Sequence, residues 1–117
     1  ILEFQQLVRM VPVADAVARY AVDLVRATRH TDPTAPDFVK NYVNFGASVR
    51  GVQYLVLASK ARALMNRRYH VSYDDIRALV KPVLRHRILL NYRAESDRVT
   101  PDDILDRLLD WKPAPRE

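Results

Sequence analysis

The sequence predicts a small all-helical bundle: four main helices preceded by a short one, in a single domain over residues 1–117. Three observations support this prediction. Apolar residues recur at helical spacing along most of the chain, two stretches open with the same N-capping pattern, and loop-forming residues gather between the periodic stretches. A chain of 117 residues is also long enough to bury one modest core.

The first quarter of the chain predicts a short helix and then a longer one. In residues 1–10 the apolar positions at rough helical spacing are Leu2, Phe4, Leu7 and Val8. Pro12 suits the first turn of the next helix, where its missing N–H needs no partner. One face of that helix is formed by Val13, Val17, Tyr20, Ala21, Leu24, Val25 and Thr28. Residues 30–37 then read as a loop with two prolines, and residues 38–45 as an extended or single-turn segment.

The central helix is expected over residues 49–66, with Ser48 as its N-cap. Residues 54–58 are apolar nearly all round, so we expect this helix to be the most buried one. On this interpretation Leu57 lies in the core, as does Leu84 of the following helix.

The last two helices open alike, with V-S-Y-D-D-I at residues 71–76 and V-T-P-D-D-I at residues 99–104. Ser72 and Thr100 are predicted N-caps, each with an aspartate three positions later in the manner of a capping box. We expect Trp111 to close the core and residues 112–117 to fray. The predicted core positions of these two helices are Ile76, Leu79, Val80, Val83, Leu84, Ile88, Ile104, Leu105, Leu108 and Leu109. A brief pairing of extended residues near Val43, Val71 or Val99 is also allowed.

Composition excludes several kinds of site. With only two glycines the chain has neither the glycine-rich phosphate loop nor the dinucleotide fingerprint. The three histidines have no metal-ligand spacing, so we expect no metal site, and no serine stands in a nucleophile motif. No apolar run approaches the length of about 20 residues needed to span a bilayer. The absence of cysteine fits a reducing cytoplasm, which is the location we expect.

The net charge of +5 leaves two interpretations open. A small basic helical module could bind nucleic acid, or act in protein interactions, with no role in nucleotide chemistry. We prefer solvated helix faces, because arginines alternate with acidic residues along the predicted helices. The arginines that could form a basic surface are Arg62, Arg67, Arg68, Arg85, Arg87 and Arg93.

One short stretch, G-A-S-V-R at residues 46–50, could carry chemistry. Gly46 allows a tight approach to the central helix, Ser48 caps it, and Arg50 projects from its first turn. A helix N-terminus attracts anions, and a guanidinium extends that reach to phosphate. Taken alone, an arginine at such a position is usually a solvated charge.

Four segments together resemble the lids of MoxR-type AAA+ ATPases. They are V-P-V-A-D-A-V-A-R-Y-A-V-D-L-V-R-A-T-R (11–29), G-A-S-V-R-G (46–51), Y-H-V-S-Y-D-D-I-R-A-L (69–79) and P-V-L-R-H-R-I (82–88). Their order matches and they cover nearly the whole chain. The chain is also similar, more distantly, to lids of magnesium-chelatase-like AAA+ proteins. Val49 stands where these lids commonly have proline, and Gly51 stands where another small residue is common. Gly51 is expected to loosen the first turn by up to about 1 kcal/mol.

The resemblance implies that the chain is the C-terminal lid of a longer ATPase. Such a lid covers ATP, bound with Mg²⁺ to a separate core domain, and Arg50 corresponds to the arginine called sensor 2, which reaches the γ-phosphate. Gly46, Ala47 and Ser48 shape the turn that directs it. The other catalytic motifs belong to the core, so the isolated chain is expected to be inactive and to bind ATP weakly or not at all. The resemblance further implies a chaperone-like parent that forms a homo-oligomeric ring, a hexamer, with von Willebrand A-domain proteins as clients.

Overall fold

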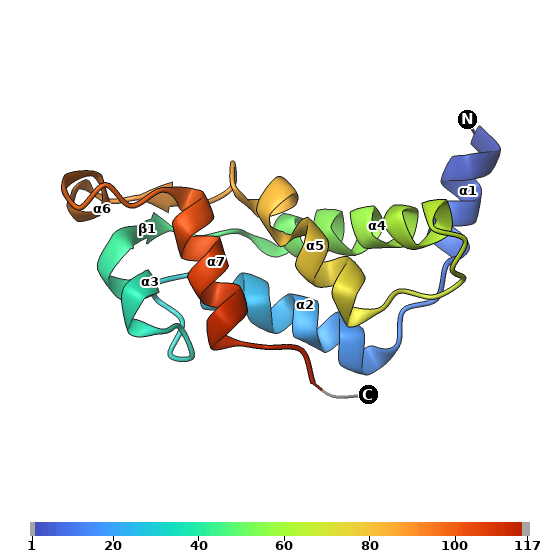
Figure 1. Cartoon of the computed structure of the whole chain (residues 1–117), viewed down its shortest axis with the longest axis horizontal. Helices are drawn as coiled ribbons and strands as arrows, with labels where there is room; N and C mark the ends of the chain where they lie inside the picture. Colours follow the sequence, from blue (N-terminus) through green and yellow to red (C-terminus); the bar gives the residue numbers. More distant parts are fainter. Residues whose placement is uncertain (1, 116–117) are drawn as a thin grey trace.

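The computed structural model describes residues 2–115 and contains seven helices and two short strands in that range (Figure 1). Their order is α1 (Leu2–Met10), α2 (Asp15–Ala27), α3 (Asp37–Tyr42), β1 (Val43–Phe45), α4 (Val49–Met65), α5 (Tyr73–Leu84), β2 (Leu89–Leu90), α6 (Tyr92–Ser96) and α7 (Pro101–Trp111). The predicted all-helical class is confirmed. The four main helices are α2, α4, α5 and α7, and α1 is the short helix that precedes them.

The four main helices pack around α5. After α4 the chain turns back, so that α5 lies alongside α4, with α2 and α7 packed against it (Figure 1). α1 stands at one end of the molecule against α4, and α3, β1 and α6 form the other end. The domain is flat and elongated, with extents of 46 × 31 × 20 Å.

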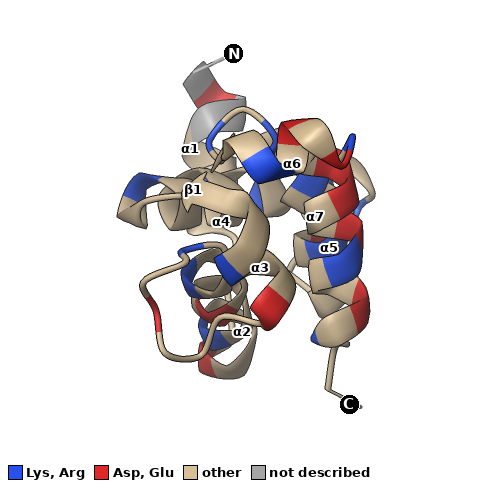
Figure 2. Cartoon of the chain, turned by 90° about the vertical axis from the view of Figure 1, so that its left-hand side faces the viewer, with Lys and Arg blue, Asp and Glu red and all other residues tan. Residues whose placement is uncertain are grey.

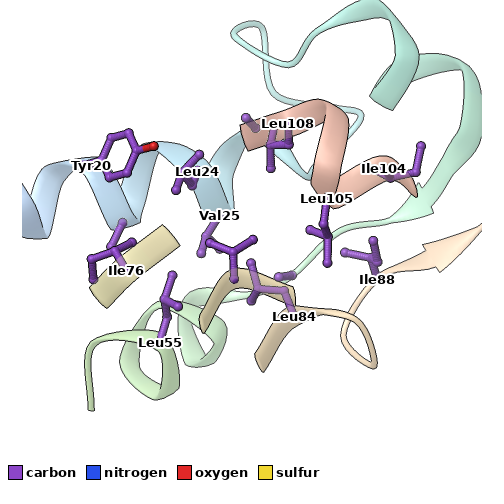
Figure 3. Close-up of a cluster of buried hydrophobic side chains, with 14 of the residues drawn as sticks. Tyr20, Leu24, Val25, Leu55, Ile76, Leu84, Ile88, Ile104, Leu105 and Leu108 are labelled. Carbon is purple, nitrogen blue, oxygen red and sulfur yellow. The ribbon is translucent and has the colours of Figure 1, made fainter. Parts of the chain in front are cut away.

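The core lies where α2, α4, α5 and α7 meet (Figure 3). Leu24 of α2, Leu55 of α4, Leu84 of α5 and Leu105 of α7 are fully buried there. The predicted apolar faces of α2, α5 and α7 are therefore confirmed, although Leu79, Val83 and Leu109 are only partly buried. In α1, Val8 is buried and Leu7 is exposed, and the predicted side chains of Leu2 and Phe4 lie outside the described residues.

Two predicted core positions are wrong. Leu57 is 43% exposed and Trp111 is 44% exposed. α4 packs on α2 and α5 through Gly51, Leu55, Ser59 and Ala63, and the opposite side of the same apolar run faces outward. The helix is therefore not the most buried one, because its neighbours cover only one of its faces.

The segment after the proline-rich loop was predicted to be either extended or a single helical turn. It forms both a short helix, α3, and a strand, β1. β1 pairs in antiparallel fashion with β2, with Val43 opposite Leu90 and Phe45 opposite Leu89. The predicted pairing near Val43 is confirmed, but its partner is the segment after α5, whereas Val71 donates its N–H to the carbonyl of Pro12 over 3.2 Å. This pairing anchors the chain just before α4 begins.

Both predicted capping boxes are present. Ser72 accepts the N–H of Asp75, and Thr100 accepts the N–H of Asp103, while each aspartate accepts the N–H of its cap residue in return. These reciprocal bonds satisfy backbone donors that a helix start would otherwise leave unpaired. The start of the final tail is also attached, because the Tyr20 hydroxyl donates to the Lys112 carbonyl over 2.7 Å. Residues 116–117 of the tail lie outside the described part of the chain.

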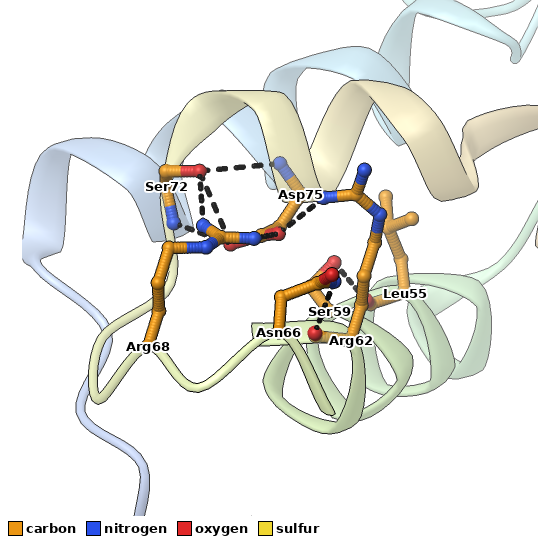
Figure 4. Close-up of polar contacts among 7 residues, drawn as sticks. All are labelled: Leu55, Ser59, Arg62, Asn66, Arg68, Ser72 and Asp75. Carbon is orange, nitrogen blue, oxygen red and sulfur yellow. Dashed lines mark hydrogen bonds and ion pairs between the residues drawn. The ribbon is translucent and has the colours of Figure 1, made fainter. Parts of the chain in front are cut away.

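Asp75 also joins α4 to α5 (Figure 4). Its fully buried carboxylate accepts bonds from Arg62 of α4 at 2.6 Å, from the Ser72 N–H at 2.9 Å, and from Arg68 at both oxygens. Burial favours the neutral carboxyl, yet the bonds from Arg68, Ser72 and Arg62 outweigh it and lower the pKa of Asp75 to about 2. A buried charge with this many donors holds the far end of α4 against the start of α5.

We predict that Leu84→Ala and Leu57→Ala differ sharply in stability. Leu84 is fully buried, so its truncation leaves a cavity and should lower the free energy of unfolding by about 2–5 kcal/mol. Leu57 is largely exposed, and its truncation should cost less than about 1 kcal/mol. Urea unfolding followed by circular dichroism measures both. Equal losses would contradict the packing of α4 described above.

Asp75 should also make stability depend on acidity. Its folded pKa of about 2 lies below the ordinary value of 3.8, so the stabilisation is present above about pH 4 and is lost as the pH falls towards 2. Asp75→Asn should lower the unfolding free energy at pH 7 by about 3 kcal/mol, because it leaves two arginines without their anion. The same substitution should also make the unfolding free energy fall less steeply as the pH is lowered from about 4 to 2.

The matched control for Asp75 is Asp106→Asn. That residue pairs with Lys81 at 2.9 Å with its side chain 55% exposed, so its removal should cost about 1 kcal/mol or less. Urea titrations of the wild type and both variants between pH 7 and pH 2 test the comparison. If the unfolding free energy of Asp75→Asn fell with pH as steeply as that of the wild type, Asp75 would not be the cause of the acid-induced loss.

Candidate functional site

The candidate site is the turn between β1 and α4, where Gly46 lies against the end of α2. A Cβ built on Gly46 would stand 2.4 Å from the Thr28 carbonyl oxygen and 2.7 Å from the Arg29 Cα. Both atoms belong to the backbone and cannot move aside as a side-chain end can. Glycine is required here because the two backbones approach too closely for any side chain.

The Thr28 hydroxyl stabilises the same junction, between the end of α2 and the turn before α4, through two hydrogen bonds. It donates to the Val25 carbonyl over 2.6 Å and accepts the N–H of Ala47 over 3.0 Å. Thr28 and Ala47 are both buried, so these bonds form away from water and leave no donor unpaired. The end of α2 and the residue just before α4 are thereby held together.

Ser48 and Arg50 lie on the outer side of this junction. Ser48 occupies the N-cap position with an extended backbone, but its hydroxyl accepts none of the N–H groups of the first turn. The predicted capping bond is therefore wrong, and at this exposed helix end water can serve those donors instead. Arg50 projects from the first turn and is exposed. No ion pair of Arg50 is found among the described residues.

The predicted site residues thus gather in one place, with different roles. Gly46 and the buried residues Ala47 and Thr28 form the support, and Ser48 and Arg50 form the exposed surface. A pocket of about 300 Å³ lies beside them, with Val25, Arg29, Ser48 and Val52 in its lining. Thr28 was identified from the sequence only as part of an apolar stripe. Its hydroxyl role depends on Ala47, which lies 19 positions along the chain.

Gly51 has a packing role that the sequence did not indicate. It is buried, and a Cβ there would lie 3.2 Å from the Ala47 Cβ and 3.3 Å from the Leu84 Cδ2. Its small size therefore lets α4 lie close to α5 directly behind Arg50. This close contact offsets the looseness expected of a glycine in the first turn.

Half of the six arginines of the proposed basic surface have acidic partners among the described residues. Arg62 and Arg68 bind Asp75, and Arg85 contacts Asp102 at 3.3 Å. Acidic and basic segments lie side by side along α5 and α7 (Figure 2). The interpretation as solvated, mixed helix faces is the one these contacts support.

Within residues 2–115, no group of three or more histidine and acidic side chains is arranged to hold a metal ion. None of the described helices combines the length and the apolar character needed to cross a membrane.

Comparison with known proteins gives consistent matches. Residues 37–108 match the AAA lid domain family. The chain is 33% identical to Chaperone MoxR1 of Mycobacterium tuberculosis, over 93% of this chain and 29% of that protein. It is 35% identical to Protein MoxR of Paracoccus denitrificans, over 71% of this chain and 26% of that protein. The chain therefore spans less than a third of the length of either relative.

A solved structure has the same fold. The crystal structure of a proposed ATPase from Cytophaga hutchinsonii is similar to this domain with a TM-score of 0.87 and 29% sequence identity. The similarity covers 95% of this chain and 34% of that one.

We predict that Gly46→Ala destabilises the domain by at least about 2 kcal/mol, because the added methyl group meets backbone atoms that cannot relax. Gly51→Ala is the matched control. It meets side chains at 3.2 and 3.3 Å and gains helix propensity, so its net effect should stay within about 1 kcal/mol. Urea unfolding of both variants gives the comparison. Wild-type stability of Gly46→Ala would show that the junction is not tight.

Proposed function

The chain belongs to the AAA lid domain family and is a lid of the MoxR type, and on that premise we propose that it covers ATP bound to a separate core domain. In this proposal Arg50 is the sensor 2 arginine, which contacts the γ-phosphate. The observation that carries the proposal is the exposed guanidinium on the first turn of α4, mounted on the Gly46–Thr28 junction.

The chemistry of phosphoryl transfer fits such an arrangement. Charge on the transferred phosphoryl group is stabilised largely by positioned cations and N–H donors, so the catalytic contribution of an arginine depends on where it is held. The first turn of α4 adds the positive end of the helix dipole beside Arg50. Because the chain has no phosphate loop of its own, the triphosphate must be bound by another domain. The isolated lid therefore has no ATPase activity and binds ATP weakly or not at all.

The junction behind Arg50 gives the proposed contact its precision. Ala47 is fixed by the Thr28 hydroxyl, Gly46 by the backbone of α2, and Gly51 by Leu84 of α5. The end of α2 and helix α5 thus define the axis from which the arginine projects. A long side chain on such a base loses less freedom on reaching its ligand than one on a mobile loop.

We also propose the properties of the whole protein from the family. The parent binds ATP with Mg²⁺, forms a homo-oligomeric ring, a hexamer, and lies in the cytoplasm. Similarity to a protein named Chaperone MoxR1 supports a chaperone-like role. The clients in this proposal are von Willebrand A-domain proteins, as the family resemblance implies. The lid supplies Arg50 to a site that the core assembles.

In the full-length parent, Arg50→Ala should lower ATP turnover roughly 10²- to 10³-fold, the loss expected when one positioned donor to a developing charge is removed. The melting temperature should stay near that of the wild type, since Arg50 is exposed. Arg93→Ala, which removes another exposed arginine, on α6, is the control and should keep full turnover. Steady-state hydrolysis assays give the result. Unchanged hydrolysis in Arg50→Ala would overturn the sensor 2 assignment.

A further inference from the structure

A second arginine lies beside the first turn of α4. Arg87 follows the end of α5, and its guanidinium carbon lies 4.3 Å from the centroid of the Tyr54 ring. This is a cation–π contact, which holds the planar guanidinium by its face and leaves its N–H donors free at the edge. Arg87 is exposed, and Tyr54 is 44% exposed. The pair is therefore open to a ligand.

Helix geometry places Arg87 on the same side of α4 as Arg50. Arg50 and Tyr54 are four positions apart and share a helix face. Side chains on a helix lean towards its N-terminus, so the Tyr54 ring covers the turn that carries Arg50. The stem of Arg87 passes the same turn, because its Cδ lies 3.9 Å from the position that a Gly51 Cβ would occupy.

Among the described residues, no carboxylate neutralises either guanidinium. No salt bridge of Arg50 or Arg87 occurs within residues 2–115, although Arg85, two positions from Arg87, contacts Asp102 at 3.3 Å. A pocket of about 750 Å³ adjoins Tyr54 and Arg87, and Arg9 and His86 are the other ionisable groups in its lining. An anion bound near both guanidiniums would relieve the repulsion between their like charges.

We propose that Arg87 is a second phosphate-binding residue, which contacts the same polyphosphate ligand as Arg50. Arg50 reaches forward from the start of α4, and Arg87 approaches from the end of α5 with its fork held flat on Tyr54. A ligand with several phosphate groups can accept bonds from both guanidiniums, each in a bidentate fashion. This inference rests on the proposed function, because it assigns Arg87 to the ligand that Arg50 binds.

The test uses the full-length parent protein and measures the dissociation constants of MgATP and MgADP by titration. Arg87→Ala should weaken MgATP binding roughly tenfold or more, the effect of losing charged hydrogen bonds to phosphate. Arg87→Lys keeps the charge but loses the planar fork, so its affinity should lie between those of the wild type and Arg87→Ala. Arg85→Ala is the matched control and should bind MgATP as the wild type does, because Asp102 already occupies that guanidinium.

The other possible results of these titrations separate a failure of the inference from a failure of the proposed function. If Arg50→Ala loses MgATP affinity or turnover while Arg87→Ala binds as the wild type does, the inference fails and the proposed function stands. If neither variant changes binding or turnover, both fail. Equal weakening by Arg85→Ala would indicate a general loss of positive charge and overturn the inference. Altered ring assembly with unchanged MgATP affinity in Arg87→Ala would assign the residue to a subunit contact and overturn it too.

Discussion

The contact between Gly46 and the backbone at Thr28 is the constraint on which the arrangement of this domain depends. It brings the end of α2 and the start of α4 closer than any side chain would allow. The Thr28 hydroxyl then makes the approach favourable, because it accepts the Ala47 N–H that the tight turn would otherwise leave unpaired in the core. From this junction α4 begins in a fixed direction, and the position of Arg50 follows from it.

The opposite end of α4 is held by a different kind of interaction. There Asp75 is buried with its charge and is stabilised by Arg62, Arg68 and the Ser72 N–H (Figure 4). Arg67, just after the helix, adopts a left-handed backbone with φ of 60°, a conformation more usual for glycine. The helix is thus fixed by backbone fit at its start and by charge at its end. Neither end depends on the exposed side chains near Tyr54 and Arg50.

The features that the sequence predicted correctly are those governed by neighbouring residues. The capping boxes at Ser72 and Thr100 need only four consecutive residues, and both formed. The buried faces of α2, α5 and α7 follow from a clear periodicity. Leu57 was misplaced because residues 54–58 are apolar in every direction, so the sequence does not show which side a neighbour will cover. The partner of Val43 was missed for a similar reason, since a two-residue strand at Leu89–Leu90 has no recognisable pattern.

The turn that carries the candidate site was predicted from the sequence, but the contacts that hold this turn in place were not. Gly46, Ala47 and Ser48 were identified as the turn before the helix, yet the bond from Ala47 to Thr28 joins elements separated by a proline-rich loop. The stacking of Arg87 on Tyr54 likewise joins α4 to the end of α5. Such contacts depend on tertiary packing, which local spacing does not encode.

Fixing α4 at both ends has a mechanical consequence. The helix cannot twist or slide by itself without breaking either the backbone fit at Gly46 or the charged cluster around Asp75. A force on Arg50 would therefore rotate the whole domain as a rigid body. In a body 46 Å long, a rotation of a few degrees about one end moves the opposite end by a few ångström.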